Sequence, residues 1–269
     1  IVFLFLDNEK KISVTVFFIS LIFLSIGSFS SMLIHRLPLM ESNKKINLFT
    51  PRSHCVFCKK TIPFYFLIPI FGFMLQKGKC KFCNNKIRSF YLINELIHLL
   101  IGLALYFYFG LSLIFLFSYL IFFCFYILFI LDFKFFYLPF NINILLLILG
   151  LTSNGIFNTF EEVFIELQFI SHSYFYGAVL GYLSLWIINF CFKKIKGKDG
   201  IGGGDFVLFA GIGSISGILS LAPILLIGTI SSLFLYVSKP KMFSKQMPLG
   251  SCLIFGFLTY IFFNITELF

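Results

Sequence analysis

The sequence predicts an all-α polytopic membrane protein with about eight transmembrane helices and a small cytoplasmic zinc-binding loop domain. Of the 269 residues, 59% are hydrophobic and only 12% are charged, and the mean hydropathy is +0.99. Several uncharged apolar runs approach or exceed the roughly 18 residues that cross a hydrocarbon core about 30 Å thick. Between the first two runs lies a polar, basic segment that carries four cysteines in two C-x-x-C pairs.

Eight apolar runs are the expected membrane helices. In chain order they are residues 12–34, 90–109, 111–131, 138–156, 173–192, 206–219, 221–237 and 249–265. The separators at Gly110 and at Leu219-Ser220-Leu221 are thin, so either of them could hide a long kinked helix. We divide the chain into residues 1–34 with the first helix, residues 35–89 with the cysteines, and the membrane-embedded residues 90–269.

Basic residues set the expected orientation, because cytoplasmic loops of membrane proteins are enriched in Lys and Arg. Eight spans place all but two of the 21 basic residues on one face, in residues 35–89, 193–198 and 239–245 and at Lys134. The other face holds Lys10, Lys11, Glu161, Glu162 and Glu166. The net charge of +10 therefore reflects membrane topology, and we expect no nucleic-acid partner.

The cysteine pairs predict a metal site. Cys55 and Cys58 form one C-x-x-C pair, and Cys80 and Cys83 form the other. Four thiolates complete a closed tetrahedral zinc site, which is structural because it leaves no open position. The alternative is four unliganded cysteines. His54 could compete as a ligand, although a bystander role is favoured.

An apolar run of residues 62–75 separates the two cysteine pairs. It contains Pro63 and Pro69 and is too short to span a bilayer. We therefore interpret it as an interfacial or re-entrant segment.

Two aspartates, Asp132 and Asp205, stand at the predicted cytoplasmic ends of membrane helices. A carboxylate at bilayer depth is costly, so it is a functional-site hypothesis by default. Two on one side of the membrane suggest paired acid and base chemistry on water, in which one carboxylate is ionised and the other is protonated. The alternative is that Asp205 belongs to an ordinary loop before a helix.

Glycines crowd the approach to Asp205, at Gly200, Gly202, Gly203 and Gly204. Glycine costs a helix interior roughly 1 kcal/mol relative to Ala. We therefore expect an irregular backbone over all four glycines, and an extended substrate segment could pass along Gly202, Gly203 and Gly204. Asp199, in a Lys-rich loop, is interpreted as a solvated charge or a cap of the glycine loop.

Five short motifs, in this order, resemble one family. Residues 27–41 read GSFSSMLIHRLPLME and resemble G-S-F-x-N-x-x-I-x-R-x-P, and residues 51–58 match P-x-S-x-C-x-x-C. Tyr91 and Glu95 echo Y-P-x-V-E, Asp132 with Pro139 matches D-x(6)-P, and residues 202–205 match G-x-G-D. Together they resemble the type IV prepilin peptidases, which are prepilin leader peptidases and N-methyltransferases of the GxGD type of membrane aspartyl protease.

The resemblance implies an enzyme of the bacterial cytoplasmic (inner) membrane, with residues 90–269 as its peptidase domain and the active site facing the cytoplasm. It implies cleavage of the basic leader of a prepilin or pseudopilin by Asp132 and Asp205. It further implies methylation of the new N-terminus with S-adenosylmethionine, and pilus or type II secretion assembly proteins as candidate partners. Glu95 is then a polar group for substrate or methyl-donor binding, whereas the alternative is a helix-packing hydrogen-bond network.

Four positions depart from the family's usual residues. They are Ser31 for Asn, Phe90 for Arg, Leu92 for Pro and Val207 for Lys. All four leave the aspartate pair intact, but they bear on substrate anchoring and on methyl transfer. Two other functions therefore stay open: a peptidase without methyltransferase activity, and a zinc-stabilised scaffold or transporter in which the aspartates line an ion pathway.

Overall fold

The computed structural model describes residues 2–43, 46–160, 164, 172–243 and 246–267. Among these residues the regular structure is helical, and the only β-pairing is two isolated bridges, His54 with Thr61 and Lys79 with Lys86. The long helices are α1 (Val2–Ser42), α3 (Phe90–Phe109), α4 (Leu113–Phe135), α5 (Phe140–Gly155), α7 (Ser173–Lys196), α8 (Gly203–Ser216), α9 (Leu221–Ser238) and α11 (Leu249–Glu267). Three short elements are η1 (Phe64–Leu67), α2 (Phe71–Leu75) and α10 (Pro240–Phe243).

The chain forms two compact units, Ile1–Leu111 and Ser112–Phe269. The first unit contains α1, the four-cysteine segment and α3, and the second contains the remaining long helices. Helix α1 continues past the predicted end of the first span at residue 34, through Pro38 to Ser42. An interior proline removes one backbone hydrogen bond and crowds the carbonyl group four residues earlier, at a cost of about 3 kcal/mol, and α1 continues through Pro38 in spite of this cost.

Each predicted apolar run contains a helix. Five helices of the described residues are long and apolar enough to cross a membrane, namely α1, α3, α4, α7 and α9. Helices α5, α8 and α11 are apolar but shorter over their described apolar parts. The prediction of a multi-pass α-helical membrane protein is confirmed, while the count of eight spans stays a prediction.

Helices end at or just before the two thin separators and do not continue through them. Gly110 ends α3 with φ 62°, and Gly217 ends α8 with φ 89°. Only glycine adopts such positive φ angles with these extended ψ angles without steric cost. Helix α3 therefore stops at the first separator. Helix α8 stops before the second separator, and α9 begins at Leu221, so neither separator hides a kinked helix.

In the first unit, α1 packs against α3 through small residues. A Cβ placed on Gly27 would lie 2.7 Å from Cα of Glu95, and one on Gly102 would lie 2.3 Å from Cδ2 of Phe23. Asn94 Nδ2 donates a hydrogen bond of 2.8 Å to Ser31 Oγ across the same interface. Close backbone approach with an interhelical hydrogen bond is typical of helix pairs in membranes.

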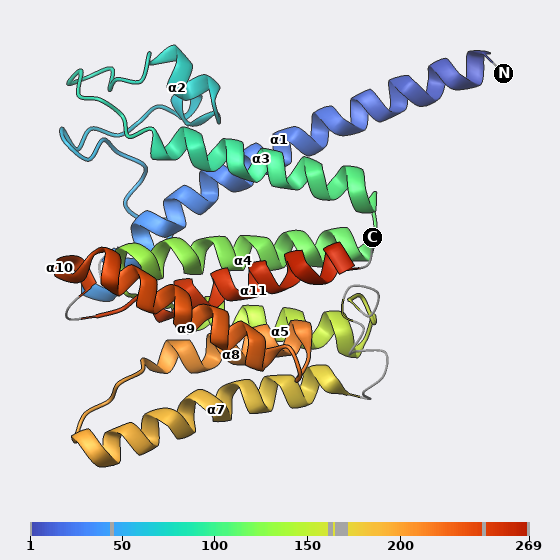
Figure 1. The fold of residues 1–269 in the computed structure, drawn as a ribbon. Helices are drawn as coiled ribbons and strands as arrows, with labels where there is room; N and C mark the ends of the chain where they lie inside the picture. Colours follow the sequence, from blue (N-terminus) through green and yellow to red (C-terminus); the bar gives the residue numbers. More distant parts are fainter. Residues whose placement is uncertain (1, 44–45, 161–163, 165–171, 244–245, 268–269) are drawn as a thin grey trace. The chain divides into compact units, whose positions relative to one another are not determined.

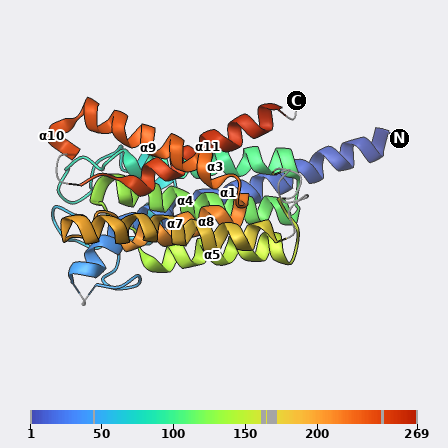
Figure 2. The same cartoon turned by 60° about the horizontal axis from the view of Figure 1, so that its bottom comes forward.

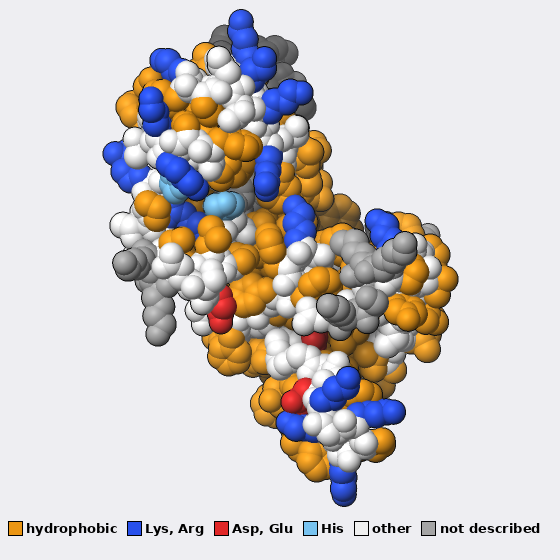
Figure 3. Space-filling view, turned by 90° about the vertical axis from the view of Figure 1, so that its left-hand side faces the viewer, with side chains coloured by type: hydrophobic (Ala, Val, Ile, Leu, Met, Phe, Trp, Pro, Cys, Tyr) orange, Lys and Arg blue, Asp and Glu red, His pale blue; other side chains and the backbone are white. Residues whose placement is uncertain are grey.

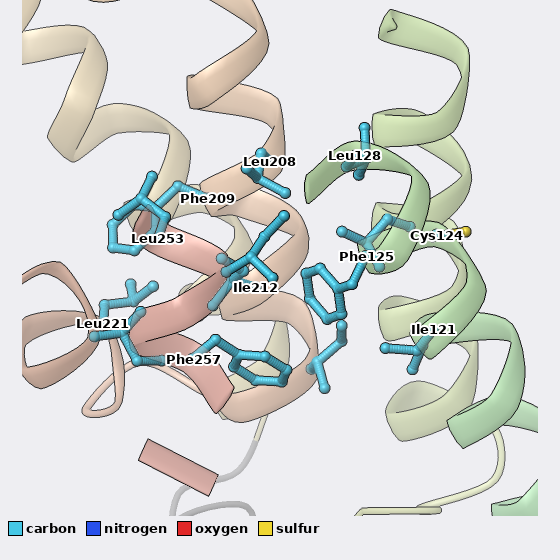
Figure 4. Packing of buried hydrophobic residues seen from close by; sticks show 14 of the residues in the cluster. Ile121, Cys124, Phe125, Leu128, Leu208, Phe209, Ile212, Leu221, Leu253 and Phe257 are labelled. Carbon is cyan, nitrogen blue, oxygen red and sulfur yellow. The ribbon is translucent and has the colours of Figure 1, made fainter. Parts of the chain in front are cut away.

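In the second unit, α8 is the central helix, and all of its residues from Asp205 to Ser216 are buried. Helices α5 and α7 pack on it closely, since a Cβ on Gly177 would lie 2.3 Å from the carbonyl oxygen of Gly213. Figure 4 shows side chains of α4, among them Phe125 and Leu128, facing Leu208 and Ile212 of α8 across this core. The buried helix α8 therefore holds its first turn, with Asp205, in a fixed place.

The helices of the second unit alternate in direction. Figures 1 and 2 show that α4, α7 and α9 end on the side where α5, α8 and α11 begin. Lysines occupy the last turns of α4 and α7 at this end. The loop with Glu161, Glu162 and Glu166 includes residues outside the described ones. Asp132 and Asp205 thus lie at the same, lysine-bearing end of the unit.

Candidate active site and zinc module

Asp132 lies in the last turn of α4 and is buried, with 4% of its surface exposed. Its Oδ2 atom accepts two hydrogen bonds from Ser251, one of 2.5 Å from the backbone N–H and one of 2.8 Å from the hydroxyl. The hydroxyl also lies 3.1 Å from the carbonyl oxygen of Phe129. One residue of α11 therefore fixes the orientation of this carboxylate.

Asp205 lies in the first turn of α8 and is also buried. Backbone amides of Gly202 and Gly250 face the carboxylate of Asp205. The carboxyl group of Asp132 is close enough to interact with it electrostatically. Its Oδ1 atom is buried and has no hydrogen-bond partner among the described residues. A buried polar oxygen without a partner is costly, so this atom is where a bound proton, water or substrate group would be stabilised.

The N-terminus of α11 lies against both aspartates. The first backbone N–H groups of a helix have no partner within the helix and favour negative charge nearby. Here Ser251 donates to Asp132, and the preceding residue Gly250 faces Asp205. A Cβ on Gly250 would lie 3.2 Å from Oδ2 of Asp132 and 2.8 Å from Cδ1 of Leu138, so glycine keeps this approach open.

Sequence reasoning missed Gly250 and Ser251. The signal available was the start of an apolar run just after Pro248, at the same predicted face as the aspartates. That signal places the start of a helix at the correct depth. It does not show that the helix start lies beside residues more than a hundred positions earlier in the chain.

The prediction of an irregular backbone at Gly203 and Gly204 is wrong, because the glycine stretch before Asp205 is irregular only as far as Gly202. Gly203 and Gly204 are the first residues of α8, and Gly202 precedes them as its N-cap in extended conformation. A Cβ on Gly204 would lie 2.7 Å from Cβ of Leu138, whereas nothing lies within 4 Å of one on Gly203. The structure leaves open space beside Gly203. Contact of Gly202, Gly203 and Gly204 with a substrate stays a prediction.

The preceding loop is held by α7. Asn189 Oδ1 accepts hydrogen bonds from the backbone N–H groups of Gly200, at 2.8 Å, and Ile201, at 3.0 Å. Its Nδ2 atom donates to Asp199 at 3.0 Å, and Lys193 pairs with Asp199 at 3.0 Å. The Lys193 ammonium and the Asn189 amide lower the pKa of Asp199. Asp199 is thus an exposed charge, the first of the two roles expected from the sequence, whereas Asn189 is the residue that accepts the hydrogen bonds of the glycine loop.

The four-cysteine module in the first unit brings its sulfurs together. The Sγ atoms of Cys55, Cys58, Cys80 and Cys83 all lie within 4.8 Å of one another. Cys55 and Cys83 are 3.8 Å apart, and a tetrahedral zinc site with Zn–S bonds of about 2.3 Å sets its sulfurs about 3.8 Å apart. The donor set and the spacing fit a zinc ion. His54 is no part of the cluster and lies with Nδ1 2.9 Å from the carbonyl of Arg52.

Each cysteine pair is a turn of the same design. The N–H of Lys59 donates to the carbonyl of Cys55, and that of Asn84 donates to the carbonyl of Cys80, both at 2.9 Å. Lys59 and Asn84 both have positive φ, of 59° and 57°. The repeated geometry turns both sulfurs of each pair toward the centre of the cluster.

The thiols influence one another strongly. Burial raises the pKa of Cys55, but hydrogen bonds from the backbone of Cys58 and Phe57 and from neighbouring thiols outweigh it and lower the pKa to about 7. At Cys83 a backbone hydrogen bond from Asn85 lowers the pKa, whereas burial and the other thiols raise it to about 11. Thiols this close cannot all ionise alone, and a bound dication removes the conflict.

Glu95 is buried at the interface of α1 and α3. Its Oε2 atom accepts a hydrogen bond of 2.7 Å from the backbone N–H of Ile70, in the apolar stretch between the cysteine pairs. Ser28 also contacts its carboxylate. The structure therefore shows Glu95 in a hydrogen-bond network, which is one of its two expected roles. Binding of a methyl donor by Glu95 stays a prediction.

The chain matches two protein-family models. The bacterial peptidase A24 N-terminal domain matches residues 21–109, and the type IV leader peptidase family matches residues 118–237. A Dichelobacter nodosus protein described as prepilin leader peptidase/N-methyltransferase is 31% identical over 92% of this chain and 91% of its own. The chain belongs to the type IV leader peptidase family. The resemblance that the motifs predict is confirmed.

Other relatives within the type IV leader peptidase family carry the same description. The protein of Neisseria gonorrhoeae is 32% identical over 82% of each chain. That of Vibrio cholerae is 28% identical over 91% of this chain and 95% of its own. No solved structure matches the chain. The two matched family regions fall within the two compact units of the structure, one in each.

Proposed function

We propose that this protein cleaves the basic leader of type IV prepilins or pseudopilins, with Asp132 and Asp205 as the catalytic pair. Membership of the type IV leader peptidase family supports the substrate class. The observation that carries the assignment of the pair is the N-terminus of α11, where consecutive residues Gly250 and Ser251 face the two buried aspartates. Lysines at the same end support a site that faces the cytoplasm, in the inner membrane of a bacterium.

The chemistry follows from two neighbouring carboxyl groups that share one proton. The ionised carboxylate takes a proton from water, and the water oxygen attacks the scissile carbonyl carbon. The protonated carboxyl group donates its proton to the carbonyl oxygen as the tetrahedral intermediate forms. As the C–N bond breaks, one hydroxyl of the intermediate returns its proton to the pair while the C=O bond re-forms, and the departing amine takes up a proton from the pair, which is left with one proton as at the start. Because the two groups titrate together, neither is assigned alone as acid or base.

A substrate that is itself a membrane helix suits a site at the end of a helical bundle. Such a helix can arrive laterally within the bilayer and present its junction with the leader at the depth of the aspartates. The open space at Gly203 is where an extended backbone would pass. This arrangement favours the peptidase over a scaffold or transporter.

We further propose methylation of the new N-terminus from S-adenosylmethionine, on the support of the relatives' descriptions. Glu95 is the proposed residue for methyl-donor binding. We expect Glu95→Gln to reduce methyl transfer more than cleavage, because a glutamine oxygen can still accept the N–H of Ile70 while the charge is lost. Glu95→Ala removes both features and is the matched comparison. Equal loss of both activities in Glu95→Gln would limit Glu95 to structure.

Mass measurement on purified, reconstituted protein tests the function. The substrate carries a short basic leader, a Gly-Phe junction and an apolar helix. We expect loss of the leader without S-adenosylmethionine, and a further gain of one methyl group on the mature N-terminus when it is present. Cleavage without methylation at a saturating donor concentration would leave a peptidase alone. An intact substrate in both arms would favour the scaffold or transporter.

A further inference from the structure

Residues 62–75, between the two cysteine pairs, present exposed apolar side chains. We call these residues the interfacial segment. It contains η1, in which no residue is buried, and α2, in which only Gly72 is buried. Phe64 is 75% exposed, Leu75 66% and Met74 65%. Exposed apolar groups gathered in this way mark a site of protein or membrane interaction.

The segment is compact and tied to a membrane helix. A Cβ on Gly72 would lie 2.1 Å from the carbonyl oxygen of Phe66, so α2 folds back tightly on η1. Between them Ile70 has φ 60°, which is unfavourable for a β-branched residue. The hydrogen bond from its N–H to Glu95 Oε2 stabilises this conformation.

That tether sets the depth of the segment relative to α3. Glu95 lies five residues beyond the start of α3 at Phe90, which is about 7.5 Å along the helix axis. Helix α3 is long and apolar enough to span a membrane. The interfacial segment therefore lies beside the first turns of a membrane helix, where the headgroups meet the acyl chains.

Apart from Glu95, the charged residues around the segment in the sequence are basic. Every charged residue between Ser42 and Glu95 is Lys or Arg, and Lys77, Lys79 and Lys81, which follow the segment, are exposed. The ammonium of Lys81 lies over the ring of Phe66 at 5.5 Å from its centroid. Figure 3 shows Lys and Arg side chains surrounding hydrophobic ones over this module, at the top of the view.

We propose that the interfacial segment docks into a bilayer surface of anionic lipid. Phe64, Phe71, Met74 and Leu75 enter the boundary between headgroups and acyl chains, and the three following lysines contact the headgroups. Amphipathic segments with apolar residues on one side and Lys or Arg on the other bind membranes in this way. This docking anchors the zinc module to the membrane independently of any peptidase or methyltransferase activity.

Fluorescence quenching by lipids with brominated acyl chains tests the proposal in reconstituted full-length protein. Trp186 is the only tryptophan, so Trp186→Phe gives a background for single probes. We expect Phe71→Trp to be quenched, and Phe57→Trp, which lies between two metal-binding cysteines, to be quenched at most weakly. An unquenched Phe71→Trp, or equal quenching of both probes, would overturn the docking.

A second arm tests the lipid charge. Quenching of Phe71→Trp is expected to be at least about twofold stronger in vesicles with anionic lipid than in purely zwitterionic vesicles. Replacing Lys77, Lys79 and Lys81 together by Gln should abolish this difference. Equal quenching in the two lipids before the replacement would refute the preference for anionic lipid.

Discussion

Ser251 gives two hydrogen bonds to a single oxygen of Asp132, and its own side chain is almost fully buried. Its backbone N–H is part of α11 and survives any substitution except proline. The hydroxyl can be removed alone. Ser251 is therefore a positioning residue in the proposed mechanism, and its contribution can be separated from that of the helix.

We expect Ser251→Ala to lower kcat for cleavage by about tenfold to a hundredfold, since a hydrogen bond to a charged group contributes about 1.5–3 kcal/mol. KM should stay within about twofold, because Ser251 contacts Asp132 and not the substrate. Ser251→Thr keeps a hydroxyl and should restore most of kcat. Steady-state kinetics on a prepilin substrate measures both constants.

Ser216→Ala is the matched control. Ser216 is equally buried in the same unit, but within the described part of the chain its hydroxyl bonds to Ile212 and Ser220, at the far end of α8. The kcat of the Ser216→Ala variant should match that of the unmodified protein. Similar losses in the two variants would assign the effect of Ser251 to general packing.

The aspartates could be predicted from the sequence because an acid at bilayer depth is unusual by itself. The role of Ser251 could not, since it depends on a contact between residues 119 positions apart. Glu95 shows the same limit. Its position predicts a buried acid, but only the fold shows that Ile70 is its partner.

Among the elements, α8 depends most on its surroundings. It has 14 residues and is therefore about 21 Å long, shorter than a hydrocarbon core. The apolar run predicts its existence, while its short length follows from Gly202 at its start and Gly217 at its end. Hydropathy depends on composition alone, so it cannot show at which glycines a helix within an apolar segment begins and ends.

The loop before α8 yields a prediction about Asn189. We expect Asn189→Ala to speed hydrogen exchange at Gly200 and Ile201 by about tenfold and to lower cleavage several-fold, because both backbone N–H groups lose their acceptor. Exchange followed by mass spectrometry of peptides from this loop provides the measurement.

Lys193→Gln serves as the comparison for Asn189→Ala. It removes the exposed ion pair with Asp199, and such surface pairs contribute little to stability. Exchange in the loop should stay unchanged in this variant. Unchanged exchange in Asn189→Ala would contradict the anchoring role of Asn189.

At the scale of the whole molecule, the sequence predicts the class of an α-helical multi-pass membrane protein, which the structure confirms, while the orientation of the chain in the membrane stays a prediction. Apolar runs and basic loops are features of local composition. Local composition decides which segments enter the hydrocarbon core and which loops stay in the cytoplasm. The division into two units depends on which helices pack together, and α1 with the zinc module and α3 forms one of them. No local pattern in the chain carries that information.

The zinc module yields a prediction for the intact protein. We expect about one zinc ion per chain, bound by four sulfurs at about 2.3 Å, as X-ray absorption would show. Cys58→Ser or Cys80→Ser should reduce the metal content and expose residues 51–89 to proteolysis, since metal binding stabilises such small modules.

Cys191→Ser is the control for these variants, because Cys191 is an exposed cysteine on α7 outside the cluster. It should keep full metal content and resistance to proteolysis. Four free thiols in a protease-resistant module without metal would contradict the zinc assignment.

The central claim is that Asp132 and Asp205 together perform the cleavage. Its most direct test compares kcat/KM on one prepilin substrate for Asp132→Asn, Asp205→Asn and Asp199→Asn, each confirmed as folded and membrane-inserted. An amide cannot act as a general base, so we expect losses of at least about a thousandfold for the first two. Asp199→Asn, an exposed carboxylate in the same region, should stay within about threefold of the unmodified protein. Near-normal turnover in either Asp132→Asn or Asp205→Asn would contradict the account.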